Sequence, residues 1–218
     1  MKALTGLYLP EELKRALHSS RVDNNAIASA DPYPVETYSK LVELIASIAI
    51  MNPALVPYYR GQNREYKVGA DNSKSSVLPS IYRGDFGSGS SKMAIQQINN
   101  NFNMLNRACE LVVQYTKDRS FSGPVFKILQ RRKIMQWAIL QHYEVCPTPL
   151  IDITQSLRIA CMFAWAEADL STQPVVYVIG MPYVCGPITF DAEGELYLMR
   201  LLNLMPPNAK RPFFRKDT

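Results

Sequence analysis

Four polar side chains in this sequence could together bind and activate a small anionic molecule: Arg60, His142, Asp152 and Thr154. An arginine offers a planar, permanently charged fork that matches phosphate or carboxylate. A histidine exchanges a proton near neutral pH, and an aspartate can orient either of these side chains. The alternative is structural: His142 would then end a helix and Asp152 would cap a helix or hold a turn.

A central stretch, residues 140–164, is expected to position three of these side chains. Its residues 150–154 alternate in polarity, so we predict a short strand with Asp152 and Thr154 on one face. A helix follows, and either Thr154 or Ser156 is its candidate N-cap. Free N–H groups and the helix dipole converge at such a junction, so we predict that an anion binds there.

Other catalytic chemistries find less support. Cys146 lies four residues from His142, but Pro147 follows directly and no motif is present to orient the pair. The chain has no P-loop, no Gly-x-Gly-x-x-Gly, no His-Glu-x-x-His and no Gly-x-Ser-x-Gly. The sequence therefore disfavours P-loop nucleotide hydrolysis, zinc hydrolysis and serine-esterase chemistry.

The composition is typical of a globular protein with a full core. The chain has 218 residues, 47% of them hydrophobic, which predicts one domain or one domain with a small subdomain. A formal net charge of +5 permits an anionic partner without requiring one. The four cysteines lack Cys-x-x-Cys spacing and indicate buried thiols, not zinc ligands or disulfides. With no signal peptide and no apolar run of roughly 20 residues, we expect a cytoplasmic protein that does not enter a membrane.

Helical and strand periodicities predict an α+β fold. The predicted helices are 10–17, 35–52, 92–117, 125–143 and 156–169, and the predicted strands are 55–61, 174–180 and 195–201. Residues 62–91 are expected to form a long loop, interrupted only at residues 77–82. Such a loop is either disordered or functional, as a lid or a substrate-contacting loop. The helix 156–169 is apolar nearly all round, so we expect it to be buried. The cations Arg131, Arg132 and Lys133 are expected to face solvent, with an anion-binding patch as the alternative.

These elements suggest one compact unit with a helical beginning. Residues 1–54 are expected to form a helical segment packed on the core of an α+β domain, residues 55–218. In that domain a small mixed sheet would carry the polar pocket.

Three motifs, in this order, resemble the signature of the FRG domain family. They are Tyr59-Arg60-Gly61-Gln62, then Leu78-Pro79-Ser80-Ile81-Tyr82-Arg83, then a long run with Gln141-His142-Tyr143, Pro147-Thr148, Asp152-Ile153-Thr154 and Ala160-Cys161-Met162-Phe163-Ala164. The sequence departs from the family pattern with Tyr59 for Phe, Glu144 for Gly and Pro149 for Arg, and the last change removes a phosphate-binding cation. Residues 211–215 match only part of the family's closing element, so we expect a truncated C-terminus.

The order of strand, hydroxyl residue and Ala-rich helix also resembles ADP-ribosyltransferases and related NAD-binding folds. The resemblance implies an ADP-ribosyltransferase-like fold in which Arg60 clamps the NAD phosphates and Thr154 or Ser156 lines the nicotinamide ribose. It further implies that a glutamate supports an oxocarbenium-like transition state. Glu195 is the candidate, in competition with the glutamates at positions 144, 167 and 193.

By the same resemblance, Gln62, Arg83 and Tyr143 are further candidates for cofactor binding, with NAD as the cofactor and no metal ion. The protein would be an ADP-ribosyltransferase-like or NAD-glycohydrolase-like effector of a bacterial toxin or phage-defence system, with a nucleic acid or a protein as target. Two alternatives stay open. One is a non-catalytic module that binds a nucleotide or nucleic acid through Arg60, Arg83 and the basic patches; the other is a protein-interaction domain. Its oligomeric state is left open.

Overall fold

The computed structural model describes residues 8–17, 24–68, 74–83, 95–118, 124–166, 168, 172–182, 188–190 and 197–199. The chain forms two compact units. Unit 1 consists of residues 1–77 and 152–184, and unit 2 consists of residues 78–151 and 185–218. Helix α3 (Tyr38–Met51) and strand β1 (Leu55–Gln62), which flank the boundary expected at residues 54 and 55, therefore belong to the same unit.

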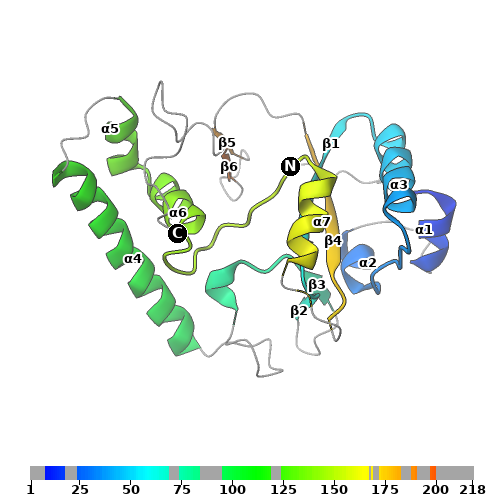
Figure 1. Ribbon diagram of the computed structural model, residues 1–218, viewed down its shortest axis with the longest axis horizontal. Coiled ribbons are helices and arrows are strands. Elements are labelled where there is room, and N and C mark those ends of the chain that lie inside the picture. Colours follow the sequence, from blue (N-terminus) through cyan, green and yellow to red (C-terminus); the bar gives the residue numbers. More distant parts are fainter. Residues whose placement is uncertain are drawn as a thin grey trace. The chain divides into compact units, whose positions relative to one another are not determined.

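Unit 1 is built on a long antiparallel strand pair. Strand β1 pairs along its whole length with β4 (Val175–Pro182), from Leu55 opposite Pro182 to Gln62 opposite Val175. On one side of the pair lies α7 (Leu157–Trp165) (Figure 1). On the other side lie α1 (Glu11–Ala16), α2 (Asn24–Ser29) and α3.

A short hairpin and a helical turn follow β1. Strand β2 (Tyr66–Val68) pairs antiparallel with β3 (Lys74–Ser76), and the 3-10 turn η1 (Ser80–Tyr82) comes next in the chain. The prediction of one long loop at residues 62–91 is thus wrong in part, because strands this short leave no periodic pattern to detect. The mixed sheet is also wrong for the described residues, whose three strand pairs are all antiparallel.

Both ends of α3 are fixed by side-chain hydrogen bonds. Thr37 is the N-cap, and its Oγ1 accepts a hydrogen bond from Lys40 N at 3.2 Å. At the other end Asn52 precedes a proline, and its Nδ2 donates to the carbonyls of Ile48, at 2.7 Å, and Tyr8, at 2.8 Å. The buried Asn52 therefore ends the helix and also fastens the chain that leads into α1.

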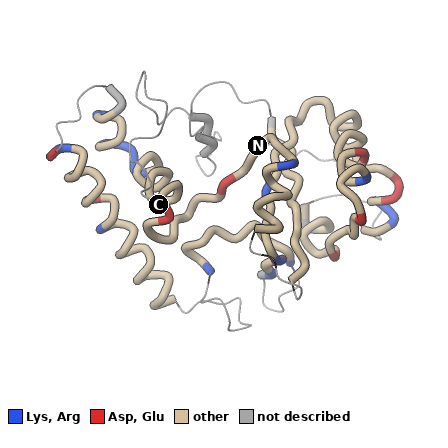
Figure 2. Tube along the Cα trace, viewed as in Figure 1, with Lys and Arg blue, Asp and Glu red and all other residues tan. Residues whose placement is uncertain are grey.

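Charged residues of both signs lie on α1 and α3 (Figure 2). Lys14 Nζ is 2.8 Å from Glu11 Oε1, and Lys40 Nζ is 3.3 Å from Glu12 Oε2. Water and salt screen exposed pairs of this kind, so they add little stability. The stability of this helical layer must come instead from its apolar side chains, of which Leu44 and Ile45 are buried.

Unit 2 is mainly helical in its described part. It contains α4 (Ile95–Asp118), α5 (Pro124–Arg131), α6 (Lys133–His142) and the strand pair β5 (Ile188–Phe190) with β6 (Tyr197–Met199). One buried cluster joins η1, α4 and α6 through Ile81, Leu105 and Leu140. Asn101 on α4 strengthens this junction, since its Nδ2 donates to the Ile81 carbonyl at 3.0 Å.

The predicted helix 125–143 is wrong in one respect, because it is interrupted at Arg132. The backbone of Arg132 is extended, with φ −111° and ψ 100°, and separates α5 from α6. The buried Gln136 side chain donates to the Leu129 carbonyl at 2.8 Å and satisfies an acceptor that the break leaves behind. The apolar periodicity continues across the break, so the sequence could not reveal it. Arg131, Arg132 and Lys133 are all exposed.

The remaining element predictions have mixed outcomes. The helices at 10–17, 35–52 and 92–117 and the strands at 55–61, 174–180 and 195–201 are confirmed where the structure describes them, while α2 was not predicted. The prediction that the helix at 156–169 is buried all round is wrong. Ala160 and Ala164 are buried, but Met162, Phe163 and Trp165 are about two-thirds exposed, at 65%, 63% and 67%. The described helices include none long and apolar enough to cross a membrane.

Candidate functional site

Predicted site residues meet near the end of β1 in unit 1. The guanidinium of Arg60 donates from Nη1 to the Asp152 carbonyl at 2.9 Å. Next to it, Thr154 forms a β-bridge with Tyr59, with N–H···O bonds of 2.7 and 2.9 Å in the two directions. We call Arg60, Asp152, Thr154 and Ser156 the corner cluster. The cluster joins a strand that carries a cation to the segment that leads into α7.

The hydroxyls of the corner cluster hold the start of α7. Ser156 is the N-cap, and its Oγ accepts a hydrogen bond from Ile159 N at 3.4 Å. Thr154 Oγ1 accepts from Ser156 N at 3.0 Å and so fixes the turn before the helix. The predicted strand at 150–154 is wrong, because Thr154 alone among these residues makes a bridge. Arg60 therefore contacts Asp152 through the main-chain carbonyl of a residue that lies outside any strand.

Gln62 adds a second polar group beside the arginine. Its Oε1 accepts a hydrogen bond from Arg60 Nε at 3.0 Å, which also fixes which end of the amide is oxygen. The side chain is buried, with 5% exposed, and its Nε2 has no hydrogen-bond partner among the described residues. A buried donor without an acceptor is unfavourable, so a ligand oxygen placed here would gain a hydrogen bond.

Gly61 allows the backbones of β1 and α7 to pack closely beside the corner cluster. A Cβ built on Gly61 would lie 1.8 Å from the Ala160 carbonyl oxygen and 2.7 Å from Ala164 N. The backbone of β1 therefore approaches the backbone of α7 more closely than any other residue type would permit. The small residues at positions 61, 160 and 164 form a single strand–helix contact, although they lie in motifs far apart in the sequence.

Three further signature residues, Ser80, Gln141 and Thr148, are joined by hydrogen bonds within unit 2, and we call them the Thr148 lock. Thr148, with 0% exposed, donates from Oγ1 to Gln141 Oε1. Its main-chain N–H donates to Ser80 Oγ at 3.0 Å, and its carbonyl accepts from Ile81 N at 3.2 Å. Every one of these groups is used inside the fold, so the polar atoms of this lock hold the chain in place instead of presenting a ligand site.

The other candidates from the sequence belong to unit 2 or fall outside the described residues. His142 is exposed in the last turn of α6, with its ring edge-to-face against Tyr143 at a centroid distance of 4.9 Å. Arg83 donates from Nε to the Leu78 carbonyl at 2.8 Å and holds its own turn. Both belong to unit 2 with Tyr143, so their participation in a site with Arg60 stays a prediction. Glu195 lies outside the described residues, as do the glutamates at 167 and 193.

The helix α6 ends in a left-handed residue at Glu144. Its φ is 53°, and it is the one non-glycine residue with positive φ in the described part of the chain. Glu144 N donates to the Gln141 carbonyl and Val145 N to the Leu140 carbonyl, both at 3.0 Å. This pair of bonds is a Schellman motif, whose left-handed position favours glycine. Glycine, which the resemblance to the FRG domain family implies at this position, would adopt this conformation without strain.

We expect Glu144→Gly to stabilise unit 2 by about 1 kcal/mol, because glycine adopts the left-handed conformation without a Cβ clash. Glu144→Ala is the matched control: it removes the same carboxylate but keeps the Cβ, so it should give no such gain. Urea unfolding followed by circular dichroism measures both variants. Equal stabilisation by alanine and glycine would show that the carboxylate, not the backbone, is responsible.

Burial keeps several ionisable groups in their neutral forms. It raises the pKa of Cys109 to about 11 and also raises the pKa of Cys146, so neither thiol is activated as a nucleophile. The Cys146–His142 pair, which the sequence already disfavours, gains no support from the structure. Tyr177, opposite Arg60 in the strand register, is 3.0 Å from Ser75 Oγ through its hydroxyl, and burial raises its pKa. The sequence did not single out Tyr177 or Ser75, since their pairing depends on strand register.

The architecture and the site together define a class of protein. It is an α+β protein in which β1, the strand that carries Arg60, is joined by a main-chain β-bridge to the segment just before α7. One face of α7 is buried. Within the ranges that the structure describes, no group of three His, Cys, Asp or Glu side chains is arranged to hold a metal ion.

The model of the FRG domain family matches residues 57–173, which is more than half of the chain, and the chain belongs to this family. This range includes both the corner cluster and the Thr148 lock. No curated protein and no solved structure is significantly similar to the chain.

Proposed function

We propose that the corner cluster binds the phosphate groups of NAD, and that the protein is an ADP-ribosyltransferase-like or NAD-glycohydrolase-like effector of a bacterial toxin or defence system. The observation that carries the proposal is the hydrogen bond from Arg60 to the Asp152 carbonyl. It keeps a permanent cation beside the segment that enters the N-terminus of α7. A guanidinium and a helix N-terminus both favour a phosphate, and the Gln62 amide offers a further donor.

The chemistry would be the cleavage of the bond between nicotinamide and ribose. Water adds to the ribose carbon, the C–N bond breaks, nicotinamide leaves with the bonding electrons, and one proton is released. In an ADP-ribosyltransferase an oxygen or nitrogen of the target takes the place of water. Arg60 would neutralise the phosphates, and the hydroxyl of Thr154 or Ser156 would face the ribose.

A carboxylate would complete this reaction by supporting the oxocarbenium-like transition state. Glu195 is the proposed residue. His142 would exchange the proton. A nucleotide-binding module without catalysis would use the same phosphate contacts but would need neither Glu195 nor His142.

Arg60→Ala tests the proposal, and Arg60→Lys is the matched control that retains the charge. A charge-assisted hydrogen bond contributes about 1.5–3 kcal/mol, so the alanine variant should bind NAD roughly 10- to 100-fold more weakly. The lysine variant should fall between it and the wild type, since it keeps a cation without the planar fork. Calorimetry measures binding, chromatography measures released nicotinamide, and thermal melting verifies that each variant is folded.

Binding of NAD and release of nicotinamide together distinguish an enzyme from a non-catalytic binding module. Nicotinamide release that disappears in a folded Arg60→Ala protein supports the enzyme. Binding of NAD without any release supports the non-catalytic module. A wild-type protein that neither binds NAD nor releases nicotinamide would overturn the proposal, and so would a folded Arg60→Ala protein with unchanged affinity.

A further inference from the structure

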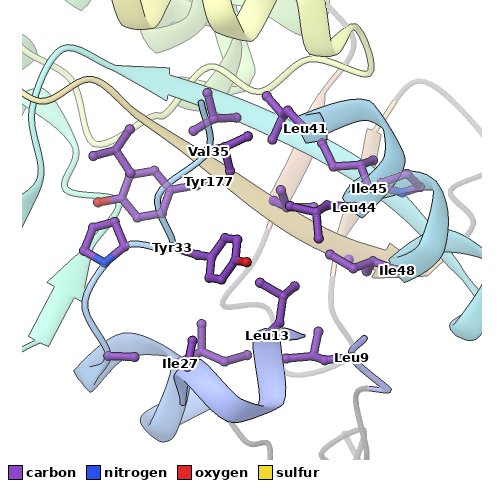
Figure 3. Close-up of a pocket in the computed structure, with 18 of the residues that line it drawn as sticks. Leu9, Leu13, Ile27, Tyr33, Val35, Leu41, Leu44, Ile45, Ile48 and Tyr177 are labelled. Atoms are coloured by element: carbon purple, nitrogen blue, oxygen red, sulfur yellow. The ribbon is translucent and has the colours of Figure 1, made fainter. Parts of the chain in front are cut away.

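Unit 1 contains a cavity that is separate from the corner cluster. It has a volume of about 330 Å³ and lies between the helices α1 to α3 and the strand pair β1–β4 (Figure 3). Neither Arg60 nor Asp152 lines it. The volume falls within the range of about 300–1,000 Å³ that is usual for small-molecule sites.

Most of the cavity wall is aliphatic. Leu13 of α1 and Leu44 and Ile48 of α3 point into it from the helices, as Figure 3 shows. Valines of β4 contribute to the opposite wall. A ligand that fills this part of the cavity must therefore be apolar, because a polar group here would find no hydrogen-bond partner.

Glu65, Ser75 and Tyr177 give the wall a polar region. The hydroxyls of Ser75 and Tyr177 are 3.0 Å apart and satisfy each other. Glu65 is different. Its Oε2 pairs with Lys67 Nζ at 3.3 Å, but its Oε1 is buried and has no hydrogen-bond partner in the part of the chain that the structure describes.

The charges around this carboxylate favour a cation. Lys67 is the nearest positive group, and its Nζ is shared between Glu65 and the Oδ1 of Asp31, at 3.6 Å. The carboxylates of Glu65 and Asp31 thus share the single ammonium group of Lys67, which leaves one negative charge among these three side chains without a matching cation. Asn52, another polar residue of the wall, already bonds the backbone of Tyr8 in both directions. Asp31 and Tyr33 also line the cavity, and the side chain of Asp31 is 96% exposed. Glu65 Oε1 is therefore the acceptor that a ligand would complete.

We propose that this cavity binds an amphipathic amine, whose apolar part fills the aliphatic wall and whose ammonium group donates to Glu65 Oε1. An alcohol with the same tail could donate one hydrogen bond but would bring no charge. A fatty acid would place its carboxylate against that of Glu65. The head group therefore decides the order of affinity: amine first, alcohol second and carboxylate last.

Three probes with the same eight-carbon tail test this order: octylamine, 1-octanol and octanoate. With the full chain, calorimetry should show octylamine binding about tenfold more tightly than octanol, in line with a charge-assisted hydrogen bond, and octanoate binding least. Octylamine should also raise the melting temperature, since it binds the folded state. Equal affinity for the three probes would overturn the proposal.

Three variants test whether octylamine binds in this cavity beside Glu65. Glu65→Gln removes the charge and keeps the shape, so the tenfold preference for octylamine over octanol should disappear. Glu43→Gln is the matched control, because Glu43 is an exposed carboxylate on α3 outside the cavity, and it should retain the preference. Ala49→Phe, whose ring would occupy the cavity, should abolish binding of octylamine and octanol alike.

If octylamine binds the Glu65→Gln or the Ala49→Phe variant as tightly as it binds the wild type, then octylamine binds outside this cavity. That result would contradict the proposal. If Glu65→Gln does not fold, the Ala49→Phe variant and the series of probes on the wild type still decide the question. None of these measurements involves NAD, so their failure leaves the proposed function of the corner cluster untouched.

Discussion

Replacing Gly61 with alanine is expected to unfold unit 1, with a loss of about 3 kcal/mol or more in the free energy of unfolding. The added Cβ would lie 1.8 Å from the Ala160 carbonyl oxygen and 2.7 Å from Ala164 N. Both are backbone atoms of α7, so no side chain can rotate to make room. Strand β1 must then separate from α7 and open the contact of Ala160, which is 0% exposed. Urea denaturation followed by circular dichroism measures the loss.

Gly180→Ala is the matched control on the partner strand. Gly180 lies opposite Pro57 in the same strand pair, and its added Cβ would meet Leu55 Cδ1 at 2.9 Å. That atom is the end of a flexible side chain, which can move to another rotamer at a cost of about 1 kcal/mol. A similar loss for both variants would mean that the close approach of β1 and α7 is not the reason for the glycine.

Thr148→Val is expected to destabilise unit 2 by about 1–3 kcal/mol. Valine fits the space of threonine but lacks the hydroxyl that donates to Gln141 Oε1 and accepts from Leu150 N at 3.3 Å. Both partners would then lose a hydrogen bond next to a position that is 0% exposed. A lower urea midpoint with an unchanged slope would identify a loss of stability and not a change in compactness.

Thr148→Ser serves as the control for this variant. Serine keeps the hydroxyl and removes one methyl group, so only the burial of that methyl is lost, about 1 kcal/mol. The serine variant should therefore be the more stable of the two. If valine is tolerated better than serine, packing of the methyl group outweighs the hydrogen bonds, and the proposed lock is wrong.

Local patterns predicted the elements well, because helix caps and apolar periodicity act over a few residues. The helix predicted at residues 35–52 corresponds to α3, Tyr38–Met51. The motif residues were also recognisable without coordinates, and the family they indicate is confirmed.

Contacts between distant segments were harder to predict. The sequence did not indicate that the main-chain carbonyl of Asp152 accepts a hydrogen bond from Arg60. Alternation of polarity describes side chains and carries no information about which main-chain groups meet. The orientation of α7 was missed for a related reason. Because β1 approaches so closely, the alanines face the strand and the large apolar residues of the helix face away.

The long strand pair also sets an order of assembly during synthesis. Strand β1 pairs with β4 and bridges to Thr154, so residues 78–151 must emerge from the ribosome before either contact can form. Until then the backbone donors and acceptors of β1 form an open edge that can pair with another chain. A nascent or prematurely terminated chain that ends before Val175 would therefore be prone to aggregate, while the finished protein covers this edge by its own fold.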